Sequence, residues 1–190
     1  DVLIKLTQQG KSPRSIARCL SALRSFYKFL REQKIRLDNP IAQHKTPKIG
    51  RALPQDLSEA DIEALILAPD LNTALGLRDR AMLEVLYACG LRVSELLLLR
   101  LELMNLKQGY LRILGKGNKE RLVPIGEVAT EWVEKYMQEA RPQLYKSATD
   151  YLFLTQHGGI MSRQNFWYAI KRYALQAGIQ SDLSPHTLRH

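Results

Sequence analysis

Apolar residues recur every three or four positions soon after the start of the chain. In the run SPRSIARCLSALRSFYKFLREQ, which begins at Ser12, this spacing predicts an amphipathic helix. The apolar positions of the predicted face are Ile16, Leu20, Leu23, Tyr27 and Leu30. The basic residues of the opposite arc are Lys11, Arg14, Arg18 and Lys28, with Arg24 at its edge. Because one helix cannot form a domain, we expect residues 1–40 to be part of a helical unit whose other helices are missing.

A change of pattern separates this helix from the rest of the chain. The stretch NPIAQHKTPKIGRALPQDLS, residues 39–58, holds three prolines and one glycine and has no sustained apolar period. Such a composition is typical of a linker between domains. We therefore predict a linker at 41–57 and a second domain at 58–190.

The second domain alternates helical and extended patterns. Ser58, with Asp61 three residues later, resembles a capping box and predicts a helix that starts near Glu59. Further helices are predicted at 77–90, 91–106, 126–141 and 162–178, with a break at Gly90. Residues 109–114 and 119–125 predict two strands around a GKGN turn, and 151–155 a strand or a buried extended piece. The predicted fold class is mainly α with a small antiparallel β-sheet.

Composition and charge narrow the functional classes. The sequence has no run of about 18 uncharged apolar residues and no signal-peptide pattern, and Cys19 and Cys89 lie far apart, so we expect a cytoplasmic protein with reduced thiols. Residues 1–50 hold 11 Lys or Arg against 3 Asp or Glu, whereas residues 51–190 hold 17 against 16. A local excess of this kind favours a polyanion as the partner, although a solvated basic face is the alternative.

The GKGN turn is the first candidate for chemistry. Lys116 lies between two glycines, at the tip of the predicted hairpin, where a long cationic side chain can reach into a groove. The turn is not a phosphate-binding P-loop, because that motif lies between a strand and a helix and has the pattern GxxxxGK[ST]. Taken alone, Lys116 is better explained as an exposed turn lysine, because most lysines are exposed.

Two further motifs carry arginines. Arg92 follows Gly90 at a predicted helix start, and Glu95, three residues later, can hold its guanidinium; the alternative is an ordinary surface pair. In LSPHTLRH, His186 and Arg189 lie three residues apart at the start of a predicted helix, where the free N–H groups favour an anion such as phosphate. The alternative is a capped surface helix without a ligand. Two arginines, a lysine and a histidine, without residues spaced to hold a metal, suit metal-free phosphoryl transfer.

These stretches together resemble the tyrosine site-specific recombinases, and in particular the Xer type. The resemblance rests on RALPQDLSEADIEAL, LRDRAMLEVLYACGLRVSELLLL, GKGNKERLVP, SRQNFWYAIKRYA and LSPHTLRH, in this order. It implies a partial helical core-binding domain followed by a catalytic domain, which clamp DNA between them. It also implies that Arg92 and Arg189 stabilise the pentavalent phosphate, that Lys116 protonates the 5′ hydroxyl leaving group, and that His186 is the histidine of the HxxR motif. By the same resemblance no metal or other cofactor is needed.

The resemblance also implies partners, and the chain differs from the family pattern at one point. Lys119 and Arg121 are expected to contact solvent or the DNA backbone. The implied partners are a short, partly palindromic DNA site, a paralogous XerC-like recombinase in a heterotetramer, and a DNA translocase as activator, with chromosome-dimer resolution as the role. The family's nucleophilic tyrosine lies beyond HxxRH, whereas this chain stops at His190 and none of its eight tyrosines occupies that position. We therefore expect a truncated catalytic domain that binds DNA without cleaving it.

Two alternatives stay open at this stage. A phage or mobile-element integrase of the same fold would carry the same catalytic residues. A non-catalytic DNA-binding module would account for the basic helix, although binding alone would not require Lys116 and His186 together. A tyrosine-bearing helix encoded after His190 would distinguish an enzyme from a binding module.

Overall fold

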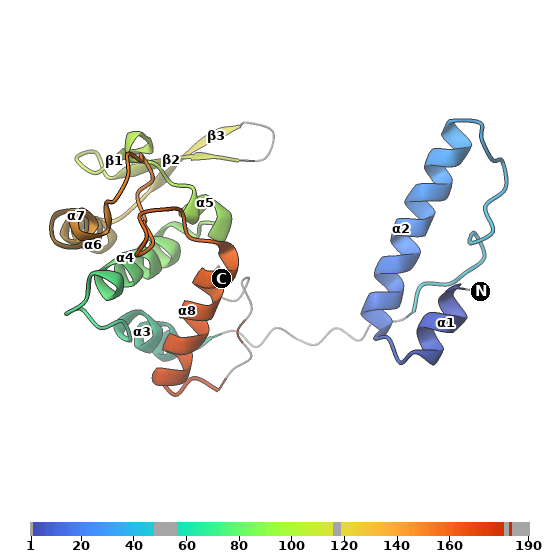
Figure 1. Ribbon diagram of the computed structural model, residues 1–190, viewed down its shortest axis with the longest axis horizontal. Helices are drawn as coiled ribbons and strands as arrows, with labels where there is room; N and C mark the ends of the chain where they lie inside the picture. The colour runs from blue at the N-terminus through green and yellow to red at the C-terminus, as the bar shows by residue number, and fades with distance from the viewer. Residues whose placement is uncertain (1, 48–56, 116–118, 181–182, 184–190) are drawn as a thin grey trace. The chain divides into compact units, whose positions relative to one another are not determined.

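The computed structural model describes residues 2–47, 57–115, 119–180 and 183. The chain separates into two compact units, Asp1–Leu53 and Pro54–His190. Figure 1 shows the helices and strands of each unit, which are described separately below. Among the described residues, no helix combines the length and the apolar character that a membrane span requires.

The first unit consists of two helices, α1 (Val2–Gln8) and α2 (Pro13–Glu32). The predicted helix after Ser12 is confirmed: the Ser12 hydroxyl accepts a hydrogen bond from the Ser15 amide at 3.2 Å, and a proline occupies the first turn, where its missing N–H is not needed. Ala17 and Leu20 are the buried residues of α2. Helix α1 was not predicted, because its seven residues are too few to show a clear helical period.

The second unit is built around helix α4 (Ala74–Cys89), whose residues from Gly76 to Leu86 are all buried. Helices α3 (Glu59–Leu67), α5 (Val93–Leu97), α6 (Glu127–Lys135) and α7 (Arg141–Leu144) pack against it, and α8 (Arg163–Gln176) contacts α3 and α5 (Figure 1). The Ser58 capping box is confirmed, with both of its hydrogen bonds to Asp61 present. Between α6 and α7 the helix is wider, a π-helical turn labelled η2 (Tyr136–Ala140), so the helical segment runs past the predicted end at 141.

A three-stranded antiparallel sheet completes the second unit. Strands β1 (Met104–Asn105), β2 (Tyr110–Leu114) and β3 (Glu120–Pro124) lie in the order β1-β2-β3, and Ile113 pairs with Arg121. Leu111 and Ile113 alternate along β2 and are buried, which is the period of a strand with one face on the core. The fold class predicted from the sequence, mainly helical with a small antiparallel sheet, is confirmed.

The helix predicted at 91–106 is wrong after Leu97. The chain instead forms a 3-10 turn, η1 (Leu101–Leu103), and then strand β1. Its backbone pairs with a distant segment: the Leu152 amide donates to the Leu99 carbonyl at 2.8 Å, and the Leu101 amide to the Asp150 carbonyl at 2.9 Å. A run of leucines is compatible with a helix or an extended piece, and here the long-range pairing determines the structure.

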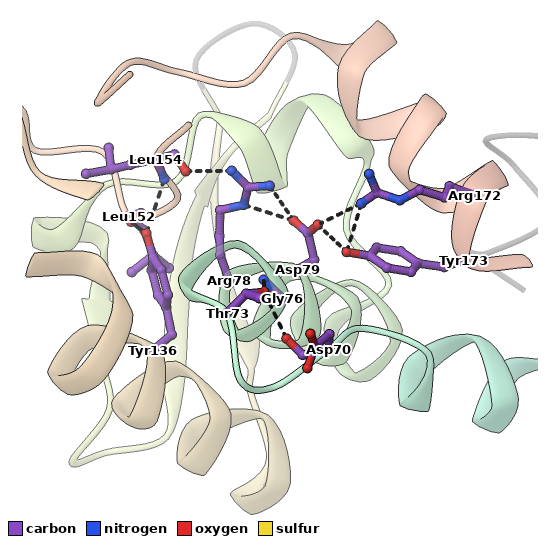
Figure 2. Close-up of polar contacts among 10 residues, drawn as sticks. All are labelled: Asp70, Thr73, Gly76, Arg78, Asp79, Tyr136, Leu152, Leu154, Arg172 and Tyr173. Atoms are coloured by element: carbon purple, nitrogen blue, oxygen red, sulfur yellow. Dashed lines mark hydrogen bonds and ion pairs between the residues drawn. The ribbon is translucent and has the colours of Figure 1, made fainter. Parts of the chain in front are cut away.

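A buried polar cluster joins α4 to α8 and to the extended segment at 152–154 (Figure 2). Arg78 donates to one carboxylate oxygen of Asp79 through Nε and Nη2, at 2.9 and 2.7 Å, and to the Leu154 carbonyl through Nη1 at 2.8 Å. The other oxygen of Asp79 accepts a hydrogen bond from the Tyr173 hydroxyl at 2.7 Å, with Arg172 at 3.9 Å. Because every buried polar group here has a partner, the cluster fixes α8 against α4.

The start of α4 is packed closely against the loop before it. The Thr73 hydroxyl caps the helix by accepting from the Gly76 amide at 3.0 Å and donates to the Asp70 carbonyl at 3.0 Å (Figure 2). A methyl group at Gly76 would overlap that Asp70 carbonyl, so only glycine fits this position without a backbone shift.

Candidate functional site

Arg92 lies at the turn between α4 and α5. Gly90 ends α4 in the left-handed conformation, with φ 55° and ψ 34°, which glycine adopts without strain. Leu91 is buried in the core, and Arg92 follows as the residue that precedes α5, with an extended backbone. The Arg92 side chain is 54% exposed and therefore reaches solvent from a well-anchored backbone.

Glu95 is the centre of the site. Its side chain is only 7% exposed, and its two oxygens accept hydrogen bonds from two arginines. Arg92 donates its backbone amide at 2.8 Å and its Nη1 at 2.9 Å. Arg121 donates its two terminal nitrogens, one to each oxygen, at 3.0 and 2.8 Å. The contact expected between Arg92 and Glu95 is present, whereas no pattern near Glu95 indicates the second arginine, Arg121, which lies 26 positions later.

The ionisation of Glu95 follows from these contacts. Burial alone would raise the pKa of this carboxyl group, but the hydrogen bonds from Arg121 and Arg92 outweigh it and lower the pKa to about 2. The group is therefore charged at neutral pH. Two arginines around one carboxylate leave the cluster with a net positive charge, which suits an anionic ligand.

The β2–β3 hairpin reaches this cluster through Arg121. At the end of the hairpin the Gly115 amide donates to the Lys119 carbonyl at 2.8 Å, and the Lys119 side chain is exposed. Lys116 lies outside the described residues, as do His186 and Arg189. Of the four predicted catalytic residues the structure thus describes Arg92, and it brings Arg92 together with Glu95 and Arg121.

The predicted basic face of α2 is present in part. Lys11, Arg14 and Arg18 are exposed and form no ion pair within the described part of the chain. Arg24 instead donates to the His44 carbonyl at 2.7 Å and to the Thr46 hydroxyl at 2.9 Å, so it holds the segment after the helix. Lys28 lies 3.8 Å from Glu32 in an exposed pair. Lys11, which precedes the helix, and Arg14 and Arg18 within it are therefore the members of the predicted basic face that lack an ion pair among the described residues.

In the part of the chain that the structure describes, the cysteines and acidic residues form no further site. Cys19 and Cys89 are free thiols, each partly buried, and burial raises the pKa of Cys89 to about 11, which keeps it in the unreactive thiol form. Within the described ranges, no three His, Cys, Asp or Glu side chains are grouped so that they could hold a metal ion.

Comparisons with known proteins match both units. Residues 55–190 match the phage integrase family, and residues 1–34 match the phage integrase N-terminal SAM-like domain. The tyrosine recombinase XerD of Pseudomonas putida is 55% identical over 183 residues, which are 96% of this chain and 61% of that protein. The chain thus spans about three-fifths of the length of the curated relatives that it matches.

Solved structures show the same fold. The crystal structure of XerA recombinase is 26% identical with a TM-score of 0.63, over 97% of this chain and 62% of that one. The XerH recombinase bound to its difH substrate in a pre-cleavage complex is 21% identical with a TM-score of 0.76, over 100% of this chain and 57% of that one. At that identity the second likeness concerns the fold alone.

Proposed function

The chain belongs to the phage integrase family, and on this premise we propose that the protein is a site-specific tyrosine recombinase of the XerD type. It cuts and rejoins DNA strands through a 3′-phosphotyrosyl intermediate. The proposal is supported by the family match over residues 55–190 and by the 55% identity to a XerD recombinase. It is also supported by the geometry at Arg92.

The arrangement of Arg92 is the observation that carries the proposal. Its Nη1 and its backbone are held by the buried carboxylate of Glu95, while half of the side chain is exposed. The remaining guanidinium nitrogens have no partner among the described residues and are available to a phosphate. A donor that is fixed before the substrate binds stabilises developing charge in the transition state without a reorganisation cost.

The proposed reaction exchanges one phosphodiester for another. A tyrosine hydroxyl loses its proton to solvent and its oxygen attacks the phosphorus, the bond from phosphorus to the 5′ oxygen breaks, and Lys116 donates a proton to that oxygen. Arg92 and Arg189 neutralise the negative charge of the pentavalent phosphate, and His186 is the histidine of the HxxR motif at the same site. A 5′ hydroxyl of the partner strand then reverses these steps and releases the tyrosine.

The nucleophile is proposed to lie C-terminal to His190, as in the family pattern. Two tyrosines of the chain already have structural tasks: Tyr136 donates its hydroxyl to the Leu152 carbonyl, and Tyr173 donates its hydroxyl to Asp79. We accordingly propose that the 190 residues alone bind DNA and do not cleave it.

The proposed partner is a DNA recombination site, and its phosphates are contacted by four exposed basic residues: Lys11 just before α2, Arg14 and Arg18 on α2, and Lys119 of the hairpin. A paralogous XerC-like recombinase completes a heterotetramer on that DNA, and a DNA translocase activates it. Resolution of chromosome dimers in the cytoplasm is the proposed cellular role. The location of the recombination site distinguishes this role from that of an integrase. A site on the chromosome would support dimer resolution, whereas a site on a mobile element would support integration.

A covalent-capture experiment tests the proposed activity. The complete gene product is mixed with a nicked suicide duplex in the absence of metal, and a protein–DNA adduct is sought on a denaturing gel. We expect an adduct with the wild type and with Arg112→Ala, which removes an exposed arginine of strand β2, but not with Arg92→Ala. Tight DNA binding without any adduct would favour the binding-module alternative.

A further inference from the structure

We infer that Arg121 is a positioning residue that holds the described part of the β2–β3 hairpin in register with Arg92. This inference rests on the proposed function, because the turn of this hairpin carries Lys116 in the sequence and the proposed reaction uses Lys116 together with Arg92. Arg121 was first expected to contact solvent or DNA. Its contacts with other residues of the chain indicate a structural role instead.

The shared carboxylate is the first observation. Arg121 and Arg92 are 29 positions apart in the sequence, but both donate to Glu95, and Arg121 does so through two parallel hydrogen bonds of 3.0 and 2.8 Å. A paired fork of this kind fixes both the distance and the angle between the two groups. Because Glu95 also holds the Arg92 guanidinium at 2.9 Å, a shift of Arg121 moves the partner of Arg92.

The place of Arg121 in the hairpin is the second observation. Arg121 pairs with Ile113, which is buried, so the hairpin is fixed to the core close to its turn. A side-chain carbon at Gly115 would lie 3.6 Å from Nη1 of Arg121 and 3.2 Å from the Lys119 carbonyl. The guanidinium therefore lies beside Gly115, the residue that immediately precedes Lys116. Arg121 thus contacts the hairpin at the point from which the chain leads to Lys116.

The hydrogen-bonding capacity of Arg121 is the third observation. Both terminal nitrogens are used by Glu95, and the side chain is 38% exposed. If Arg121 turned to a DNA phosphate, it would leave a buried carboxylate with fewer partners, which is unfavourable. Lys119, two residues earlier, is exposed and is the better candidate for a phosphate contact.

The test compares Arg121→Gln and Arg121→Lys with Arg112→Gln in the complete gene product. Arg112 is a matched control because it is an arginine of the neighbouring strand whose only ion pair within the described residues is an exposed one, 3.9 Å from Glu120. Cleavage of a nicked duplex is measured with an ordinary phosphodiester and with a 5′-bridging phosphorothiolate, whose thiolate leaves without a proton. DNA affinity is measured at several salt concentrations.

We expect Arg121→Gln to slow cleavage of the phosphodiester by about 100-fold, since misplacement of a reacting group by about 1 Å has an effect of this size. The loss should be smaller with the phosphorothiolate, because Lys116 is then not needed as an acid. DNA affinity and its salt dependence should equal those of Arg112→Gln. Arg121→Lys keeps the charge beside Glu95, so the fold is preserved, but it lacks the fork and should restore cleavage only in part.

Several results would overturn the inference. Equal cleavage rates for both Arg121 variants and Arg112→Gln would show that the paired hydrogen bonds from Arg121 to Glu95 do not position the site. Equal losses of rate on the phosphodiester and the phosphorothiolate would show that Arg121 does not act through the hairpin. A loss of cleavage that is explained by weaker DNA binding, with a smaller salt dependence of the affinity, would show that Arg121 contacts DNA instead. Absence of an adduct with the wild type would instead refute the proposed function, so the two failures are distinguishable.

Discussion

Replacement of Tyr173 by phenylalanine tests how strongly the buried cluster of Figure 2 holds α8. The change removes only the hydroxyl group, which donates to Asp79 at 2.7 Å and accepts from Arg172 at 3.1 Å. Burial, and then the negative charge of Asp79, raise the pKa of Tyr173 to about 12. The hydroxyl therefore keeps its proton at neutral pH and donates it to the carboxylate.

The magnitude follows from the charge of the acceptor and its burial. A hydrogen bond to a charged group contributes about 1.5–3 kcal/mol, so we expect Tyr173→Phe to lower the free energy of unfolding by about 2 kcal/mol. Asp79→Asn should cost more, about 3–5 kcal/mol, because it leaves the buried Arg78 without a counter-charge. The two effects should not be additive in the double variant, since both act on one hydrogen bond.

Urea unfolding followed by tryptophan fluorescence is the assay. The chain has two tryptophans, Trp132 and Trp167, and both belong to the second unit, so the signal reports this unit alone. The matched control is Tyr168→Phe on the same helix, because the Tyr168 side chain is exposed and its hydroxyl contacts only Gln164, at 3.3 Å, among the described residues. A loss of 2 kcal/mol should move the urea midpoint by about 1 M.

Equal midpoints for Tyr173→Phe and Tyr168→Phe would refute the reasoning. The hydroxyl would then contribute no more inside the cluster than on the surface, and Asp79 would be satisfied by Arg78 alone. Additive effects of Tyr173→Phe and Asp79→Asn would also contradict it, because the two groups would then act independently.

Three further predictions concern other parts of the chain. The lowering of the Glu95 pKa from 4.5 to about 2 contributes about 3 kcal/mol of stability above pH 4.5, and this contribution is lost as the pH falls towards 2. The stability advantage of the wild type over Glu95→Gln, measured by urea unfolding, should therefore shrink over this pH range. A difference that stays constant with pH would contradict the pKa shift. Arg14→Ala with Arg18→Ala should weaken DNA binding and flatten its salt dependence with little effect on base preference, as measured by titrations at several salt concentrations; an unchanged slope would make the helix face an ordinary solvated surface. Gly76→Ala should destabilise the second unit by several kcal/mol through overlap with a backbone carbonyl, whereas Gly159→Ala, with no atom closer than 3.9 Å, should leave the urea midpoint nearly unchanged.

Most of the local structure could be predicted from short stretches of sequence. The helix after Ser12, the capping box at Ser58 and the two strands around the GKGN turn follow from apolar period, capping residues and turn residues. These signals are local, because each depends on residues within about one turn or one hairpin of one another. The contact of Arg92 with Glu95 could be predicted for the same reason, since residues three apart lie on one face of a helix.

The remaining features depend on residues that are distant in the sequence. No pattern near Arg121 indicates that it would share Glu95 with Arg92, 29 positions earlier, and no pattern near Asp79 indicates Tyr173, 94 positions later. The leucine run after Leu97 was misassigned for the same reason, because its backbone pairs with residues 150–152.

The sequence by itself thus determined most of the helices, strands β2 and β3, the basic face of α2 and the candidate chemistry of Arg92, Lys116, His186 and Arg189, because period, capping and motif are properties of neighbouring residues. Only the tertiary structure decided which charges that are distant in the sequence face each other. Glu95 became the shared partner of two arginines, and Asp79 the buried partner of Arg78 and Tyr173, because burial of the surrounding apolar residues brings these groups together and a buried charge must be paired.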